Sequence, residues 1–397
     1  MDDNTLHQKP RILLIPFYFS PLGSPRGIRW TNIAHYLVQK GSDVTVVATD
    51  PPENSQFWDA SLQEIVEATG EGLRVLRIPI GARNASGTER LRWMWRALPR
   101  IRSLGESFDV VISSAMPIVC HFLGWWVKQT GRARSWIADY GDPWSTSQLR
   151  HGSALRGWVE RVIERQLLSS ADALTITTWQ AVKSFTSVYP HAERIHLVPQ
   201  GASLFHLKHD WDNADRHPGE AVCLLFTGEL SALRIDPGML FAALAECGPG
   251  VAVLTLVGPQ PIDWKARAGT FGSAEQVHLN SDYFQQQEIV QLQSEADVLV
   301  DIANIVPQHI GGKFFEYLST NKPILYVTQD RNDEKAQVIR EYKAGFVCTT
   351  VEEIVAAIHQ VKAQIQQSGT ARRERVRDVG FDERAERYWN LIYTLRG

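Results

Sequence analysis

Short runs of β-branched and aliphatic residues alternate with helix-like segments along nearly the whole chain, and this pattern occurs twice. The apolar runs of the first half are Ile12–Pro16, Asp43–Ala48, Leu73–Ile78, Asp109–Ser113, Trp136–Asp139, Asp172–Thr177 and Ile195–Val198. Those that follow Gly201 are Val222–Thr227, Val251–Val257, Val277–Leu279, Val298–Ile302, Ile324–Val327 and Phe346–Thr349. Strands rich in Val, Ile and Leu that alternate with helices build parallel sheets covered by helices on both faces. The pattern therefore predicts an α/β fold with two doubly wound parallel-sheet domains facing a cleft.

The boundary between the two series of strands lies near Pro199–Gly201. A chain of 397 residues is long enough for two or three domains, and two series of strands favour two. We expect these domains to span residues 1–200 and 201–379. The stretch His206–Glu220 has few apolar residues, so we interpret it as a linker or surface loop.

The small net charge of −3 hides a difference between the two halves. Residues 1–200 hold 22 Lys and Arg against 18 Asp and Glu, whereas residues 201–397 hold 19 against 26. Ten of the 13 tryptophans lie between Trp30 and Trp179. An overall charge near zero argues against a dedicated nucleic-acid binder. The basic, tryptophan-rich first half and the acidic second half are expected to face different partners.

Cysteine usage and hydropathy indicate a cytoplasmic protein. The four cysteines are widely spaced and form neither a zinc pattern nor a disulfide framework, which fits a reducing compartment. The polar N-terminus lacks the basic start and apolar run of a signal peptide. Residues Val110–Val127 carry no charge over 18 positions, which reaches the length of a membrane span. They include Pro117 and Gly124, so we interpret them as a buried strand, a turn and a helix.

Ligands of doubly wound sheets bind at the carboxyl ends of the strands, so the loops that follow the strands are the candidate sites. The loop after the first strand carries Gly23, Arg26, Gly27 and Arg29 and opens a helix. Glycines permit a close backbone approach, and arginines at a helix N-terminus favour a phosphate or an acidic ligand. An ordinary strand-to-helix turn explains the same residues about equally well.

The loop that follows the strand residues Trp136–Ala138 contains Asp139, Asp142 and Trp144. Two carboxylates at the end of a buried strand are unusual unless they are paired or exposed in a cleft, and a tryptophan offers a flat face to a sugar. We favour a functional site here over the alternative, an Asx turn that caps the next helix.

A third loop, after Val298–Ile302, leads into a helix that begins at Gly311-Gly312. Lys313 lies in the first turn, where a cation opposes the helix dipole unless an anion is bound. Glu316 follows one turn later on the same side of the helix. A phosphate at the amides and a ribose at Glu316 would explain these residues, whereas a plain amphipathic helix explains only Phe314, Phe315 and Leu318. A fourth loop, after Val222–Thr227, carries Gly228 and Arg234, and Arg234 is placed to reach a phosphate.

These loops make the chain similar to the GT-B glycosyltransferases of the retaining family-four type, over most of its length. The opening RILLIPFYFSPLGSPRG, the passage IHLVPQGASLF and the segment QHIGGKFFEYLSTNKPIL match the frames of that family's motifs. The last segment carries the second glutamate of the E-x7-E signature as Glu316, but Gln308 replaces the first. Glu229 stands where the family has an arginine, and Gln200 replaces an asparagine. ADYGDPW is similar to a subgroup motif DFRDPW, with Gly141 in place of arginine.

The resemblance implies a GT-B architecture of two Rossmann-like domains, with a C-terminal tail, 380–397, whose helix Phe381–Leu395 crosses back to the first domain. The donor would be a nucleotide-diphosphate sugar, transferred with retention and without a metal or cofactor. Glycines 311 and 312 with Lys313 and Arg234 would bind the diphosphate, Glu316 the ribose, Gln308 the sugar ring and the loop Asn280–Phe284 the base. The implied donor-binding residues are Gly23, Gly27, Gly228, Arg234, Tyr283, Gln308, His309, Gly311, Gly312, Lys313 and Glu316.

The implied acceptor and catalytic groups lie in the first half. The histidine that commonly follows the fifth strand in the family and contacts the donor sugar is absent. Asp142 and His121 are the nearest candidates for its place, and with Asp139 they are the candidate catalytic residues. Arg26, Arg29 and Trp144 are the candidate acceptor contacts. The partners expected are a nucleotide sugar and a lipid-linked or oligosaccharide acceptor of bacterial surface polysaccharide synthesis, and no nucleic acid.

Residues 83–102 indicate a possible membrane contact. They contain six arginines against Glu89, with Leu91, Trp95 and Leu98 at helical spacing. A basic, tryptophan-bearing amphipathic helix suits an anionic membrane surface, although a surface helix packed by its apolar face fits as well. The protein would then be peripheral on the inner face of the plasma membrane. Two other functions stay open: a sugar-nucleotide epimerase of the same fold, and a non-catalytic scaffold protein.

Overall fold

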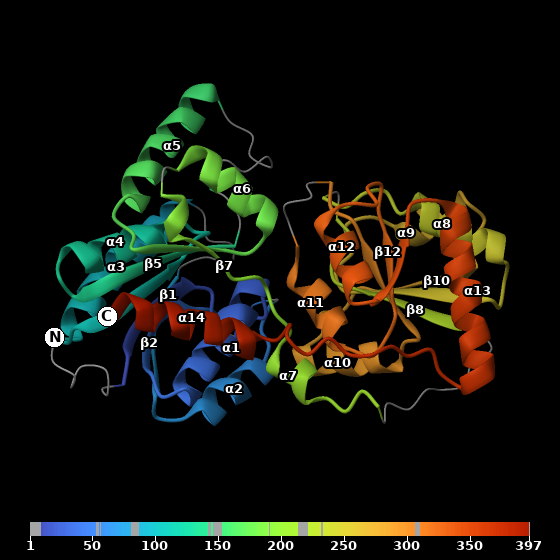
Figure 1. The fold of residues 1–397 in the computed structure, drawn as a ribbon, viewed down its shortest axis with the longest axis horizontal. Helices are drawn as coiled ribbons and strands as arrows, with labels where there is room; N and C mark the ends of the chain where they lie inside the picture. Colours follow the sequence, from blue (N-terminus) through green and yellow to red (C-terminus); the bar gives the residue numbers. More distant parts are fainter. Residues whose placement is uncertain are drawn as a thin grey trace. The chain divides into compact units, whose positions relative to one another are not determined.

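The computed structural model describes residues 9–52, 55, 57–80, 87–141, 144–145, 153–189, 191–212, 221–231, 233–305 and 310–396. They form two compact units: Met1–Gly201 with Phe381–Gly397, called unit 1 here, and Ala202–Gly380, called unit 2. Each unit has one parallel sheet between two layers of helices (Figure 1). The predicted class of two doubly wound parallel sheets is therefore confirmed.

Unit 1 contains a seven-stranded sheet with the order β3-β2-β1-β4-β5-β6-β7, in which every neighbouring pair is parallel. Its strands are β1 (Arg11–Phe17), β2 (Asp43–Asp50), β3 (Leu73–Pro79), β4 (Phe108–Ser114), β5 (Ala133–Tyr140), β6 (Ala173–Ile176) and β7 (Ile195–Leu197). The order reverses between β1 and β4, so the carboxyl ends of these two strands form the switch point of the sheet.

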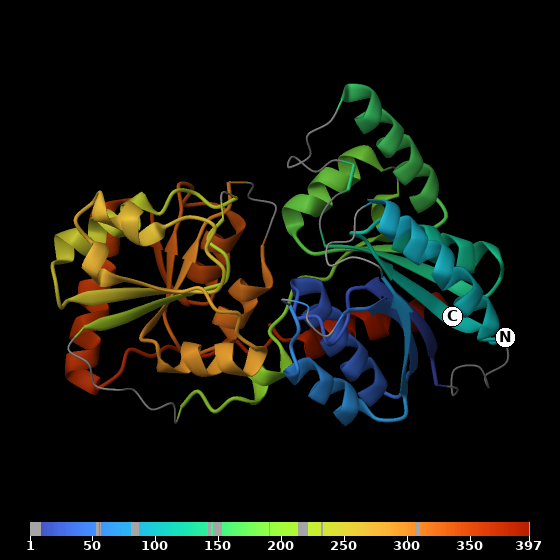
Figure 2. The same cartoon turned by 180° about the vertical axis from the view of Figure 1, so that it is seen from behind.

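The helices of unit 1 are α1 (Pro25–Gln39), α2 (Ser61–Thr69), α3 (Gly87–Ser103), α4 (Val119–Gln129), α5 (Ala154–Leu168), α6 (Trp179–Val188) and α14 (Phe381–Arg396). Helices α2 and α14 both contact α1, whereas α3 contacts α4 and α4 contacts α5. Right-handed crossovers from the two sides of the switch point place these groups on opposite faces of the sheet (Figures 1 and 2).

The uncharged stretch Val110–Val127 forms most of β4, a turn and most of α4, as the sequence predicted. Strand β4 is buried on both faces, and its Val111 and Ile112 are fully inaccessible. No helix of the described residues is both long and apolar enough to cross a bilayer.

Unit 2 contains a six-stranded sheet with the order β10-β9-β8-β11-β12-β13, again parallel throughout. Its strands are β8 (Val222–Thr227), β9 (Ala252–Val257), β10 (Val277–Asn280), β11 (Val298–Ile302), β12 (Ile324–Val327) and β13 (Gly345–Cys348). Its helices are α7 (Leu204–Lys208), α8 (Gly238–Cys247), α9 (Trp264–Gly269), α10 (Gln286–Glu295), α11 (Gly312–Ser319), α12 (Glu334–Glu341) and α13 (Val351–Ser368).

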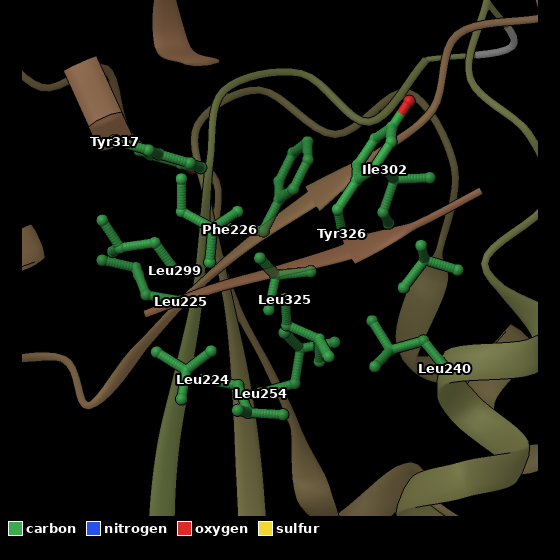
Figure 3. Close-up of a cluster of buried hydrophobic side chains, with 14 of the residues drawn as sticks. Leu224, Leu225, Phe226, Leu240, Leu254, Leu299, Ile302, Tyr317, Leu325 and Tyr326 are labelled. Carbon is green, nitrogen blue, oxygen red and sulfur yellow. The ribbon is translucent and has the colours of Figure 1, made fainter. Parts of the chain in front are cut away.

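The core of unit 2 lies against the central strands β8 and β11 (Figure 3). Leu224, Leu254, Leu299 and Leu325 come from four neighbouring strands and are each at most 1% exposed. Burying side chains of this kind contributes about 2 kcal/mol each, so the sheet gives the loops at its carboxyl edge a rigid base.

The prediction of a linker or surface loop at His206–Glu220 is wrong for His206–Lys208, which belong to α7, and for Trp211, which is buried. His206 lies within α7, and both His206 and Trp211 are fully buried. The Trp211 indole donates to the His206 carbonyl at 2.9 Å, and the two rings stack. Two large side chains in an otherwise polar stretch are enough to anchor the chain to the core.

Candidate functional site

The start of α11 is open to an anion. Gly311 is the N-cap and Gly312 is the first helical residue, as the sequence predicted. A Cβ atom added to either glycine would meet no atom of the described residues within 4 Å, so the packing of that part of the chain does not require glycine at these positions. The first amides of a helix have no partner within the helix and carry the positive end of its dipole. The glycines therefore leave room for a ligand at amides that favour negative charge.

Lys313 and Glu316 form an ion pair across the first turn of α11. The Lys313 Nζ lies 3.1 Å from the Glu316 Oε2, and the side chains are 28% and 4% exposed, respectively. Burial alone would raise the pKa of Glu316, but the Lys313 ammonium, together with smaller effects of His206 and Gln293, holds that pKa below its usual value. Glu316 is therefore ionised at neutral pH and can accept hydrogen bonds, and it is paired with the partly exposed Lys313 ammonium.

The buried side chain of His206 lies next to Glu316. The His206 Nε2 lies 3.0 Å from the Gln293 Oε1 and 3.7 Å from the Glu316 Oε2, and the Nδ1 lies 2.9 Å from the Ser203 hydroxyl. Burial lowers the pKa of His206 to about 4, against the opposing effect of Glu316. His206 is therefore neutral at pH 7 and donates from Nε2 to the glutamine.

The same network ties α11 to the end of β8. The Gln293 amide lies 3.4 Å from the Thr227 Oγ1, and the Tyr317 hydroxyl lies 3.0 Å from both the Thr227 amide and its hydroxyl. Thr227 is the last residue of β8, so the network fixes α11 against the following loop. Sequence reasoning missed His206 and Gln293, because one lay in a polar stretch and the other in a glutamine-rich helix.

Gly228 begins the loop after β8 with a φ of 113°, a backbone conformation that favours glycine. Gly258, at the end of β9, has a φ of 112°, and a Cβ there would lie 3.3 Å from the Gly228 backbone. The Gln260 amide bridges the two by donating to both carbonyls. The two strand ends thus approach each other closely, which explains both glycines structurally.

Arg234 belongs to a three-residue charge cluster. Its Nη1 lies 2.9 Å from the Asp301 Oδ1, and the Lys335 Nζ lies 2.6 Å from the other oxygen of that carboxylate. Burial alone would raise the pKa of Asp301, but the two cations lower it. One carboxylate between two cations leaves a net charge of +1. The sequence indicated Arg234 but not its partners, since Asp301 lies within an apolar strand and Lys335 in an unremarkable helix.

A cavity of about 200 Å³ lies beside this cluster. Ile235 and Ala303 line one side, and Tyr326, Thr328 and Lys335 line the β12–α12 side. The Asp333 carboxylate accepts from the Tyr326 and Thr328 hydroxyls, both at 2.8 Å, and caps α12. Asp330, Asp333 and Glu334 also line the cavity, which therefore combines three carboxylates with the Lys335 ammonium and with hydroxyl and amide groups.

The remaining predicted donor contacts of unit 2 are only partly described. Tyr283 follows β10 and is 37% exposed. Gln308 and His309 lie outside the described residues. Glu229, at the position of the family's arginine, is exposed. The described residues contain no group of three or more His, Cys, Asp and Glu placed to hold a metal ion.

The glycine loop of unit 1 is shaped by packing. A Cβ on Gly27 would lie 1.9 Å from the Leu22 carbonyl oxygen, so this position requires glycine for the turn itself. The Gly23 amide donates to the Phe57 carbonyl at 2.8 Å. Arg26 is half-buried, donates to the Ala115 and Met116 carbonyls and lies against Gly141. It therefore joins the carboxyl ends of β4 and β5.

The structure assigns Arg29 and Asp139 a structural role, which corrects the prediction that they contact a ligand. Both side chains are 1% exposed, and the Arg29 Nη2 lies 3.3 Å from the Asp139 Oδ1. The Tyr388 hydroxyl of α14 donates to the same oxygen at 2.6 Å, and the Thr175 hydroxyl donates to it at 2.9 Å. Asp139 lies within β5 rather than in the loop after it, so its side chain points into the core.

His121 is also buried and cannot reach a substrate at the surface. It is 0% exposed, and its Nδ1 lies 2.7 Å from the Ser113 hydroxyl. Burial lowers its pKa to about 3, so it is neutral at pH 7. The predicted catalytic role of His121 therefore conflicts with its position. Asp142 lies outside the described residues, and Trp144 is half-buried against the core of unit 1.

Comparisons with known proteins fit this arrangement. Residues 27–201 match the family model of the glycosyl transferase 4-like domain. A search of curated proteins with the sequence found no significant match. Similar solved structures cover nearly the whole chain. Sucrose-phosphate synthase from Thermosynechococcus elongatus is 17% identical, over 97% of both chains, with a TM-score of 0.62.

Two further solved structures have the same fold. WaaG, a glycosyltransferase involved in lipopolysaccharide biosynthesis, is 15% identical over 97% of both chains, with a TM-score of 0.58. A putative UDP-N-acetylglucosamine 2-epimerase from Listeria monocytogenes is 15% identical, over 98% of this chain and 96% of that one, with a TM-score of 0.60. Identities this low show the fold alone, and the fold is the one that the loop motifs predicted.

Proposed function

We propose that this chain, a family-four-like glycosyltransferase of the GT-B fold, transfers a sugar from a nucleotide-diphosphate donor to a lipid-linked or saccharide acceptor. The observation that carries the proposal is the start of α11. Open amides at Gly311 and Gly312, a partly exposed Lys313 and an ionised Glu316 lie within one helical turn. Such a group suits a diphosphate next to a ribose, because amides and an ammonium bind phosphate while a carboxylate accepts from hydroxyls.

In the proposed reaction an acceptor hydroxyl oxygen bonds to the anomeric carbon of the donor sugar, with retention of configuration. The bond from that carbon to the diphosphate oxygen breaks, and the hydroxyl proton passes to the leaving diphosphate. The residues of unit 2 stabilise the charge that develops on this group, which is electrostatic preorganisation. Lys313 and the Arg234–Asp301–Lys335 cluster supply positive charge for it, so we expect no need for a metal.

The acceptor class and the biological role are proposals by analogy. The fold is shared with WaaG, whose role is in lipopolysaccharide biosynthesis, and this favours a part in bacterial surface polysaccharide synthesis. Helix α3 supports a peripheral position at a membrane. Trp93, Ala97 and Ile101 pack against the core, while Leu91 and Trp95 stay exposed among Arg92, Arg96 and Arg100.

The test begins with thermal-shift measurements on UDP-, GDP- and dTDP-sugars, followed by analysis of the products formed with candidate acceptors. Binding of one donor and formation of a product that retains its anomeric configuration are expected. Conversion of the donor sugar without any acceptor would favour an epimerase, a function that shares this fold. Absence of binding by any nucleotide sugar would favour a non-catalytic role.

A further inference from the structure

Helix α5 of unit 1 exposes a continuous apolar stripe. The exposed fractions are 71% for Leu155, 58% for Trp158, 39% for Val159, 48% for Val162 and 38% for Ile163. These positions are spaced i, i+3, i+4, i+7 and i+8, so they form one face of the helix. Soluble proteins seldom expose a large contiguous apolar face without a binding purpose.

The stripe points away from the unit to which α5 belongs. The residues of α5 that are buried against unit 1 are Glu164, Leu167 and Leu168. At roughly 100° per residue, these three lie on the side of the helix opposite to the stripe. Glu164 is held there by the Tyr189 hydroxyl at 2.5 Å. The orientation of α5 is therefore fixed by its polar and apolar anchors, and the stripe faces outward.

Arginines flank the stripe on both sides. Arg156, Arg161 and Arg165 are all exposed, and at the same helical spacing Arg156 lies on one side and the other two lie on the opposite side. Arg156 pairs with Glu160 at 3.0 Å. With Glu164 buried, the exposed surface of α5 has a net positive charge. An apolar face bordered by long cationic side chains is the arrangement of a helix that lies in a bilayer interface.

Helices α3, α4 and α6 lie on the same face of the sheet as α5 (Figure 2). Exposed tryptophans occur on each of them: Trp95 on α3 at 67%, Trp125 on α4 at 38% and Trp179 on α6 at 58%. Helix α3 adds five arginines against one glutamate. Tryptophan and arginine are the residues that favour the headgroup region of a membrane. Of the ten tryptophans in the first half of the sequence, Trp95, Trp125, Trp158 and Trp179 are exposed on these four helices.

We propose that the α5 stripe inserts into the headgroup region of an anionic lipid bilayer and thereby docks unit 1 on the membrane. A second copy of the chain is the less suitable occupant, because a symmetric contact through α5 would bring the same arginines together. An anionic bilayer instead offers lipid phosphates to the arginines and acyl chains to the stripe. This inference rests on the proposed function. Docking on the membrane would bring the enzyme to a lipid-linked acceptor.

Flotation of the full chain with vesicles tests this proposal. The vesicles contain phosphatidylcholine with about one third phosphatidylglycerol, or phosphatidylcholine alone, at low salt and at roughly 0.5 M NaCl, which screens charge contacts. We expect the wild type to float with anionic vesicles and to stay partly bound at high salt. The triple variant Leu155→Glu, Trp158→Glu, Val162→Glu should lose the salt-resistant binding at least tenfold. A second variant with serine at the same positions keeps the net charge unchanged and should lose it as well.

The double variant Ile262→Glu, Tyr342→Glu is the matched control, since it replaces exposed apolar residues of unit 2 and should float like the wild type. Equal flotation of the wild type and both α5 variants would overturn the proposal. So would a wild-type dimer in sedimentation that the α5 variants dissociate while vesicle binding is unchanged, because the occupant would then be a second copy. Nucleotide binding, measured in parallel, reports on the proposed function separately, since the α5 residues are remote in sequence from the α11 site.

Discussion

Lys313 and Glu316 lie one turn apart at the beginning of α11, with 3.1 Å between the ammonium nitrogen and a carboxylate oxygen. The carboxylate is almost fully buried, while more than a quarter of the lysine side chain is exposed. A lysine at a helix N-terminus opposes the helix dipole. The pair therefore keeps a cation at this place that is only partly neutralised and can turn toward an arriving phosphate.

Replacement of Lys313 by alanine should weaken nucleotide binding. A charge-assisted contact contributes about 1.5–3 kcal/mol, so the Kd measured by calorimetry should rise by roughly 10- to 150-fold. Lys265→Ala, at an exposed position of α9, is the matched control and should bind like the wild type. If Lys313→Ala and Glu316→Ala both bound nucleotide with wild-type affinity, the proposed donor site would be refuted.

Alanine variants of two glycines of unit 2, Gly312 and Gly345, should have different effects: the first on nucleotide binding and the second on stability. Gly312→Ala adds a methyl group where no atom of the residues that the structure describes lies within 4 Å, so the free energy of unfolding should stay within about 0.5 kcal/mol of the wild type. Nucleotide affinity should fall, because the methyl group enters the space left for the phosphate. Gly345 has a φ of 151°, and a Cβ there would lie 2.0 Å from the Ile324 carbonyl oxygen.

Gly345→Ala should therefore destabilise unit 2 by at least about 2 kcal/mol. Urea unfolding of both variants, with nucleotide titrations at a temperature where they are folded, gives the comparison. If Gly312→Ala were destabilised but bound nucleotide normally, Gly312 would be needed for folding and not for binding, which would contradict the prediction.

The sheets could be predicted from the sequence because buried parallel strands have a continuous apolar pattern, as β4 and β11 illustrate. Residue identity also indicated the start of α11, where two glycines, a lysine and a glutamate have no explanation in packing alone. Asp139 was misplaced because a carboxylate near a strand end resembles a loop residue. Its partners Arg29 and Tyr388 come from α1 and α14, and sequence separation conceals such a contact. His206 was missed because it lies in a polar stretch, and its partner Gln293 is distant in the sequence, on α10.

Acidification should destabilise unit 2 through His206. The pKa of this histidine is about 4 in the folded chain, against 6.5 for an exposed histidine. The unfolded state therefore binds more protons between these values, so this contribution to stability is complete above pH 6.5 and is lost as the pH falls toward 4. The slope of the free energy of unfolding against pH reaches at most about 1.4 kcal/mol per pH unit for one such group.

The variant His206→Gln should have a shallower slope than the wild type between pH 6.5 and 4.5, measured by urea titration at each pH. His121, with a pKa of about 3, adds a contribution of the same sign in unit 1, which the variant retains. An unchanged slope in His206→Gln would contradict the burial of a neutral histidine at this position.

Arg29 should be essential for the stability of unit 1. Its guanidinium contacts Asp139, Tyr388 and the Pro199 carbonyl, the last at 2.6 Å. Removal of one partner from a buried ion pair costs about 3–5 kcal/mol, so Arg29→Ala should unfold at a much lower urea concentration. Tyr388→Phe removes the hydrogen bonds of the Tyr388 hydroxyl with Asp139, Arg29 and Thr175 but keeps the ion pair, so it should cost less, about 1–3 kcal/mol. Similar losses in the two variants would indicate that the ion pair itself contributes little.

The central claim is that unit 2 holds a nucleoside diphosphate at the start of α11. A crystal structure of the full chain with a nucleoside diphosphate, chosen from the donor that gives the largest thermal shift, tests it most directly. We predict that the phosphates lie within hydrogen-bond distance of the Gly312 or Lys313 amide and of the Lys313 ammonium, and that the ribose hydroxyls donate to Glu316. A nucleotide bound elsewhere in the chain, with the Lys313–Glu316 pair intact and untouched, would contradict the claim.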